Sequence, residues 1–142
     1  MDEGGEFMMP SSDPPRHALL AASGQCVLVV EDEILIRMML SDELRDAGFH
    51  VIEAATADEA LVILRTLVPD IVVSDVRMPG SLDGMGLLAV VRETFPALPV
   101  IIASAHLQPE LALADGATKF IAKPYRTDDI IEAIQQELAR AL

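Results

Sequence analysis

Carboxylates, a hydroxyl and an ammonium group follow four short apolar runs in this sequence. The residues are Glu31 and Asp32, Asp75, Ser104 and Lys123. Clustered carboxylates suit a hard cation such as Mg²⁺, which prefers oxygen ligands. A Lys and a Ser beside them suit a phosphoryl group, because both side chains can contact its oxygens. Each residue alone has a simpler explanation as a cap, a strand serine or a surface lysine, so this chemistry requires a fold that brings them together.

The apolar runs before these residues predict buried parallel strands, which are typically near-continuous in Val, Ile and Leu. Strands are expected over residues 25–30, 50–54, 71–74, 100–103 and 119–122. Helices are expected over residues 33–47, 56–67, 84–94, 109–114 and from 127 to the C-terminus. This alternation predicts an α/β fold, a doubly wound five-stranded parallel sheet with helices on both faces. The carboxyl ends of the strands then lie on one edge, where ligands of such sheets bind.

Local signals support several of these helix ends. Thr56 and Glu59 have the spacing of a capping box, and Gly48 is well placed to end the first helix. Thr127 is expected to cap the last helix. The helix boundaries are therefore predicted by side chains that satisfy backbone groups, in addition to the apolar periodicity.

Composition excludes several classes of function. The chain has 142 residues and a formal net charge of −13, which argues against binding to nucleic acid or to an anionic membrane surface. No run approaches the roughly 18 apolar residues of a membrane span, and the acidic N-terminus is unlike a signal peptide. The single Cys26 is expected to be a buried small hydrophobe. These features predict a cytoplasmic protein.

The first 24 residues differ in composition from the rest of the chain. They are rich in Gly, Pro, Ser and acids and show no apolar periodicity. Such a segment buries too little apolar surface to fold, so residues 1–24 are expected to form a disordered tail. Residues 25–142 are expected to form the single folded domain.

From about residue 25 onward, the order and spacing of the motifs resemble the receiver domain of two-component response regulators, in its single-domain form. The resemblance implies that Asp75 accepts a phosphoryl group from a sensor histidine kinase or phosphotransfer protein. It implies Mg²⁺ as the cofactor, held by Asp32, Asp75 and the backbone carbonyl of Arg77, with Glu31 acting through a water. The protein would be a signalling phosphoacceptor rather than an enzyme, with slow self-dephosphorylation at most.

The same resemblance implies roles for residues on the last two strands. Ser104 would contact the phosphoryl group and Lys123 would pair with it, and the peptide bond before Pro124 would be cis. Phe120 falls at the family's aromatic switch position. Phosphorylation would then change contacts with a downstream protein through Ser104 and Phe120.

Two segments depart from the form that many receivers have. Residues 79–84 are one residue longer than the usual Met-Pro-x-x-Asp-Gly, and the segment from Ser104 to Lys123 is a few residues short. The fourth helix is therefore expected to be short. In the family that helix belongs to the output surface, so a standard output dimer is less strongly predicted.

Two other functions compete with this interpretation. A haloacid-dehalogenase-like phosphatase also uses an Asp at a strand end with Mg²⁺, but it needs a second Asp two residues later, where this chain has Arg77. A receiver-like binding module that is never phosphorylated has the same fold. The complete set of charged and hydroxyl residues counts against that second alternative.

The helix expected over residues 33–47 is apolar on more faces than packing on a sheet requires. Four of its side chains suffice for packing: Ile36, Met39, Leu40 and Leu44. Three others are left toward solvent beside Asp75: Ile34, Leu35 and Met38. Exposed apolar patches mark partner surfaces, and in the family this helix contacts the kinase's helical phosphotransfer domain. We therefore predict a docking surface at Ile34, Leu35 and Met38.

Overall fold

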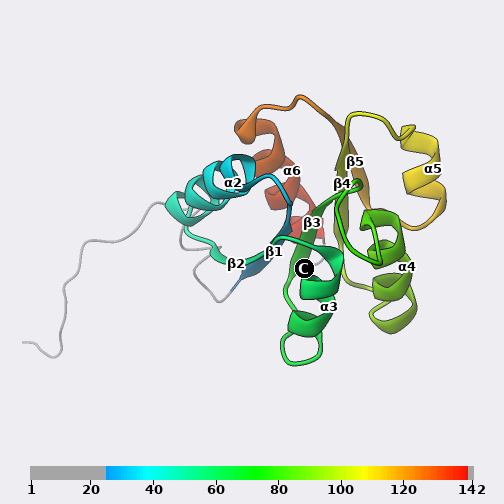
Figure 1. The fold of residues 1–142 in the computed structure, drawn as a ribbon. Coiled ribbons are helices and arrows are strands. Elements are labelled where there is room, and N and C mark those ends of the chain that lie inside the picture. Colours follow the sequence, from blue (N-terminus) through cyan, green and yellow to red (C-terminus); the bar gives the residue numbers. More distant parts are fainter. Residues whose placement is uncertain (1–24, 141–142) are drawn as a thin grey trace, which may run out of the picture.

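A computed structural model describes residues 25–140 as a parallel sheet between two layers of helices (Figure 1). The strands are β1 (Cys26–Val30), β2 (His50–Ala54), β3 (Ile71–Asp75), β4 (Val100–Ser104) and β5 (Lys119–Ala122). They are hydrogen-bonded in the order β2-β1-β3-β4-β5, and each neighbouring pair is parallel. The predicted five-stranded doubly wound sheet is confirmed. The predicted tail, residues 1–24, lies outside the described residues.

The helices divide between the two faces of the sheet (Figure 1). They are α2 (Ile34–Asp46), α3 (Ala57–Leu64), α4 (Gly84–Thr94), α5 (Pro109–Ala114) and α6 (Thr127–Arg140). One apolar cluster joins α3, α4 and α5 to the sheet, and a second joins α2 and α6 to the opposite face. The predicted short helix over 109–114 is confirmed.

The strand side chains explain why both faces are covered. Leu28 and Val30 of β1 belong to the first cluster, whereas Val27 and Val29 belong to the second. All four are at most 1% exposed, because alternate residues of a strand point to opposite faces. The chain passes from β1 to β2 on one side and then to β3 on the other, which makes the β1–β3 boundary the switch point where such sheets bind ligands.

Most of the predicted helix ends agree with the structure, with two corrections. The Thr56 hydroxyl accepts from the Glu59 N–H at 3.0 Å, and Gly48 has a φ of 100° just past the end of α2. Helix α3 ends at Leu64 rather than at the predicted residue 67, because a tighter turn with a Thr66 N–H to Ile63 carbonyl bond follows it. Thr127 is the first residue of α6, so its prediction as the preceding cap is wrong by one residue.

Helix α2 buries a different stripe from the predicted one. Leu40 and Leu44 are buried as expected, but Met39 is 61% exposed and its prediction as a packing residue is wrong. The buried stripe instead includes Ser41, and Arg37 is half-buried where it binds Glu53 on β2. These polar side chains turn the helix so that Met39 faces outward.

Three other apolar side chains of α2 are exposed as predicted. Ile34 is 59% exposed, Leu35 is 72% exposed and Met38 is 49% exposed. Together with Met39 they form an apolar surface on α2. Its exposure is confirmed, whereas its role as a docking surface remains a prediction.

Candidate functional site

Three carboxylates meet where β1 and β3 end. Glu31 and Asp32 follow β1, and Asp75 is the last residue of the neighbouring strand β3. One carboxylate oxygen from each lies within 4.8 Å of the others. Glu31 is buried, and Asp32 and Asp75 are half-buried. Carboxylates at this spacing repel one another and present hard oxygen donors, so the set fits a divalent cation such as Mg²⁺.

Lys123 bridges two of these carboxylates. Its Nζ lies 2.9 Å from Glu31 Oε1 and 3.1 Å from Asp75 Oδ2. The residue follows β5, and its N–H donates to the Ser104 carbonyl at 3.0 Å, which ties it to the end of β4. The peptide bond from Lys123 to Pro124 is cis, as the family resemblance implied. The structure therefore brings an ammonium group from one strand end onto acids from two others.

Burial and the ion pairs move two pKa values in this cluster. Burial raises the pKa of Glu31, and the hydrogen bonds that its carboxylate accepts from Lys123 and from the Glu33 N–H offset this only in part. Burial alone lowers the pKa of Lys123, but its two carboxylate partners outweigh that effect and raise it to about 12. Lys123 is therefore a firmly charged ammonium group at neutral pH.

The backbone around Asp75 is held from two sides. The Val76 N–H donates to Asp75 Oδ1 at 2.7 Å, and the Ser74 hydroxyl donates to the Asp75 carbonyl at 2.8 Å. The Gly84 N–H at the start of α4 donates to the Val76 carbonyl at 2.8 Å. A Cβ at Gly84 would overlap the Asp75 carbonyl, so a glycine allows α4 to pack directly on the strand end. The sequence analysis did not single out Gly84, although it follows the α4 cap, Asp83.

Ser104 lies at the end of β4, one residue past the level at which Asp75 pairs with Ala103. It is 3% exposed, and its Oγ accepts from the N–H groups of His106 at 3.1 Å and Leu107 at 3.0 Å. A serine hydroxyl also carries one proton to donate. Ser104 thus connects the strand end to the loop that leads into α5.

The remaining predicted site residues lie around this cluster. Phe120 pairs with Ile102 across β4 and β5. Both Phe120 and Leu107 are partly buried against the first apolar cluster. Arg77 lies two residues past Asp75, and its side chain is exposed. The structure places the Arg77 backbone in the loop between β3 and α4, next to the carboxylates in sequence.

Two residues at the site were missed by the sequence analysis. Arg37 donates to the Glu31 carbonyl at 2.8 Å and to Glu53 Oε1 at 3.3 Å, so it holds the acid-bearing turn after β1 against β2. The sequence signal that could have indicated Arg37 is its position as a single charged residue between Ile36 and Met38 in the apolar first part of α2. Tyr125, two residues after Lys123, is half-buried, and its pKa is raised by burial and by the charge of Glu31.

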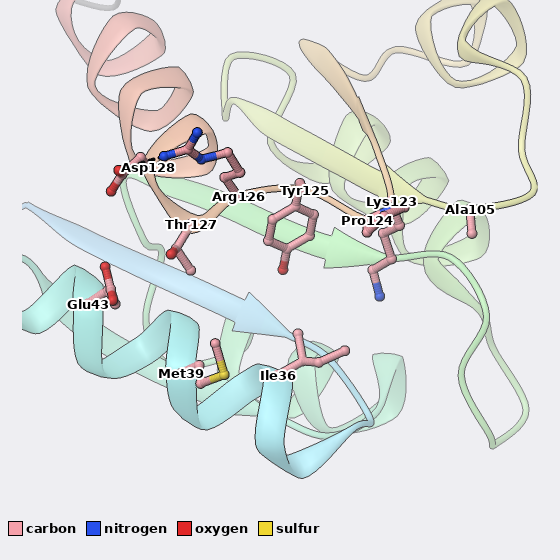
Figure 2. Close-up of a pocket in the computed structure, with 10 residues that line it drawn as sticks. All are labelled: Ile36, Met39, Glu43, Ala105, Lys123, Pro124, Tyr125, Arg126, Thr127 and Asp128. Carbon is pink, nitrogen blue, oxygen red and sulfur yellow. Dashed lines mark ion pairs between the residues drawn. The ribbon is translucent and has the colours of Figure 1, made fainter.

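A groove of about 620 Å³ runs from this cluster between α2 and the segment that follows β5 (Figure 2). Its lining is Ile36, Met39, Glu43, Ala105, Lys123, Pro124, Tyr125, Arg126, Thr127 and Asp128. Figure 2 shows the Tyr125 ring over the groove and Lys123 at one end of it. The outward turn of Met39 therefore places an apolar side chain in a cavity that adjoins the charged site.

A model of the response regulator receiver domain matches residues 27–135. The chain belongs to the response regulator receiver family. That family consists of signalling phosphoacceptors, and the match favours neither the phosphatase nor the unphosphorylated module as an alternative. Among residues 25–140, no helix has the length and apolar character to cross a membrane.

Individual relatives agree with the family assignment. The chain is 34% identical over 116 residues to the DNA-binding transcriptional regulator NtrC of Salmonella typhimurium, covering 80% of this chain and 24% of that protein. It is 38% identical over 109 residues to a putative NtrX-like response regulator of Rickettsia conorii, covering 74% and 23%. The chain thus spans about a quarter of the length of the curated relatives it matches.

Solved receiver domains have the same fold. The receiver domain of the Francisella response regulator 1452 superposes with a TM-score of 0.78 at 30% identity, covering 84% of this chain and all of that one. The receiver domain of NtrX from Brucella abortus gives a TM-score of 0.75 at 34% identity, covering 80% and 98%. The likeness to both extends over almost the whole of each solved domain.

Proposed function

We propose that Asp75 accepts a phosphoryl group from a histidine kinase or a phosphotransfer protein. The observation that carries this proposal is the cluster of Glu31, Asp32 and Asp75, whose carboxylates meet at the β1–β3 switch point with Lys123 on two of them. A carboxylate oxygen of Asp75 attacks the phosphorus of a phosphohistidine. The P–N bond breaks, its electron pair leaves with the imidazole, and an acyl phosphate forms on Asp75.

Mg²⁺ is the cofactor that this transfer requires in our proposal. Asp32, Asp75 and the Arg77 carbonyl would hold Mg²⁺, with Glu31 acting through a water. The ion supplies positive charge to the phosphoryl oxygens. Phosphoryl transfer depends mainly on such positioning and charge neutralisation, because the charge in the transition state is spread over the oxygens.

Lys123 has the position and charge to follow the reaction. It now shares its ammonium protons between Glu31 and Asp75, which are 2.9 and 3.1 Å away. When Asp75 carries the phosphoryl group, Lys123 keeps Glu31 and exchanges its second partner for a phosphoryl oxygen. Its raised pKa ensures that it enters this exchange fully charged.

Ser104 and Phe120 provide a route by which phosphorylation changes the surface. The Ser104 hydroxyl donates its proton to the phosphoryl group, and its movement alters the two bonds that it accepts from the loop before α5. Leu107 of that loop and Phe120 pack on the same apolar cluster, so this movement repacks Phe120. A two-state element of this kind needs only a few kcal/mol of bias, and a downstream protein reads the result.

The kinase or phosphotransfer protein contacts the exposed apolar surface of α2, in our proposal at Ile34, Leu35 and Met38. These side chains are at least 49% exposed and lie on the helix whose Ile36 lines the groove beside Lys123. A helical partner seated there brings its phosphohistidine to the open end of the acid cluster.

The experiment is labelling with a small phosphodonor such as acetyl phosphate in Mg²⁺, followed by measurement of acid-labile phosphate. Wild-type protein should take up close to one phosphate per chain, whereas Asp75→Asn should take up none. Asp115→Asn makes the same change at the exposed end of α5 and serves as the matched control. Labelling of Asp75→Asn would place the acceptor elsewhere, and an unlabelled wild type would favour the receiver-like module.

A further inference from the structure

The loop that follows Asp75 is hydrogen-bonded to α3, the helix that connects β2 to β3. Asp58, in the first turn of α3, accepts the Ser81 N–H at 3.2 Å on Oδ2 and the Ser81 hydroxyl at 2.9 Å on Oδ1. Both carboxylate oxygens are thus used by a single loop residue. Asp58 and Ser81 are 23 residues apart in sequence, so this contact joins two segments that the strands alone do not connect.

The loop backbone is shaped around the Asp58 carboxylate. Gly80 has a φ of +113°, which favours glycine, and a Cβ built there would lie 2.7 Å from Asp58 Oδ2. A larger residue would push the loop away from α3. Asp58 itself is favoured in this place because a carboxylate in the first turn complements the helix dipole.

Other contacts fix the two ends of the loop, and Met78 and Leu82 pack on the first apolar cluster, so Asp58 holds the stretch between them at Gly80 and Ser81. One end is held by β3, and the other by the Gly84 N–H to Val76 bond and by Asp83, which accepts from the Gly86 N–H at 2.9 Å. Residues 79–84 are also one residue longer than the usual form of this motif, which gives the middle of the loop more freedom. The pair Asp58–Ser81 restricts the stretch that this packing does not reach.

We infer that Asp58, acting through Ser81, is a positioning residue for the divalent cation site. The loop that it holds carries Arg77, whose carbonyl is the one proposed cation ligand supplied by backbone, so the inference rests on the proposed function. Without the contact the carbonyl samples more positions, and the cation is bound more weakly. Groups that hydrogen-bond metal ligands from outside change metal affinity by about 10- to 100-fold when removed, so the lower end of that range is expected for a contact four residues from Arg77.

The test is the Mg²⁺ dissociation constant, measured by isothermal titration calorimetry on the full chain. Ser81→Ala removes one of the two bonds without changing the charge, and it should weaken Mg²⁺ binding by about tenfold. Ser81→Thr keeps the hydroxyl and should restore the wild-type affinity. The melting temperature should hardly change, since both bonds lie at the surface.

Asp58→Asn adds a second, coupled test. Asn has one acceptor oxygen in place of two, so it loses part of the contact and a negative charge. If the two residues act as a unit, the double variant should lose less affinity than the two single changes combined. Asp42→Asn, which removes an exposed acid on α2, controls for the lost charge.

The outcomes separate this inference from the proposed function. A wild type that binds Mg²⁺ and takes up phosphate, together with an unchanged affinity in Ser81→Ala, would overturn the positioning role alone. A wild type that binds no Mg²⁺ would overturn both. Weaker binding in Ser81→Ala with recovery in Ser81→Thr supports the role, and chemical-shift changes at the Arg77 and Met78 amides should accompany it.

Discussion

Lys123 and Arg92 are both half-buried cations, but they have opposite kinds of partner. The Lys123 ammonium group lies on the carboxylates of Glu31 and Asp75. The Arg92 guanidinium of α4 donates only to backbone carbonyls in the bonds that the structure gives it: Phe95, Pro96, Leu98 and Gly116. The two cations therefore differ in whether their partners can bind another group in their place.

A backbone carbonyl is fixed by the chain, whereas a side-chain carboxylate can exchange its partner. Arg92 uses its planar fork to bind carbonyls from the end of α4 and from the turn before β5, which closes these segments against each other. Lys123 has a flexible stem and three rotatable donors. A half-buried cation on carbonyls therefore stabilises the fold, while one on carboxylates remains free to act on a cation or phosphoryl group.

The largest expected effect is a loss of stability when Arg92 is replaced, with Mg²⁺ binding left intact. Arg92→Met removes the donor from the carbonyls of Pro96, Leu98 and Gly116, and we expect it to lower the free energy of unfolding by about 2–3 kcal/mol. The Phe95 carbonyl keeps its bond from the Leu98 N–H. Below the melting temperature, Mg²⁺ binding and phosphate uptake should stay close to wild type. Urea unfolding and calorimetric Mg²⁺ titration measure the two effects. A full loss of Mg²⁺ binding in the folded variant would show that Arg92 also shapes the acid cluster.

The next effect concerns Lys123 and pH. The pKa of Lys123 is raised from 10.5 to about 12 in the folded state, so its contribution to stability is complete below about pH 10.5 and is lost as pH rises through 12. That shift corresponds to about 2 kcal/mol. The stability difference between wild type and Lys123→Met should therefore shrink over this range, as measured by urea unfolding from pH 9 to 12. A constant difference would contradict the ion pairs.

Added Mg²⁺ should also distinguish the two cations at neutral pH. Lys123→Met leaves Glu31 and Asp75 without their shared cation, and Mg²⁺ then supplies the missing charge. The rise in melting temperature on adding Mg²⁺ should be larger for Lys123→Met than for wild type. Arg92→Met should show the wild-type rise, since its site holds no carboxylate partner among the bonds described.

The two cations also differ in how far the sequence predicts their partners. The acid and Lys123 positions follow directly from strand ends, since parallel strands bring their carboxyl ends to one edge. Arg92 gave no such signal, because its partners are carbonyls, which every residue carries, and one lies 24 residues away. The five parallel strands were predictable from apolar runs, whereas the bonds from Arg92 to the backbone were not.

The errors in helix α2 have the same cause. Apolar spacing assigned Met39 to the buried stripe, but Arg37 and Ser41 occupy that side of the helix. Arg37 is held there by Glu53 and by the Glu31 carbonyl, partners that come from β2 and from the turn after β1. The periodicity of a helix counts apolar residues alone. It therefore did not predict that Arg37 and Ser41 face the sheet and that Met39 faces outward.

The smallest expected effect on the protein itself concerns the α2 surface, which carries no cation at all. Met38→Glu with Leu35→Ser changes side chains that are 49% and 72% exposed, so the free energy of unfolding should change by less than about 0.5 kcal/mol. Labelling by a small phosphodonor should also persist, because the acid cluster is untouched. Phosphotransfer from the cognate kinase should fall by tenfold or more, since a few side chains carry most of the binding energy of a protein–protein contact.

A matched control uses equally exposed apolar residues on the opposite layer. Val62 of α3 is 57% exposed and Leu111 of α5 is 54% exposed. Val62→Glu with Leu111→Ser introduces the same two polar side chains, and it should leave kinase transfer intact if docking is specific to α2. Equal losses in both double variants would mean that added polarity, and not a docking site, causes the defect. Loss of small-donor labelling in the α2 variant would show instead that the change reaches Asp75, and it would contradict a role limited to docking.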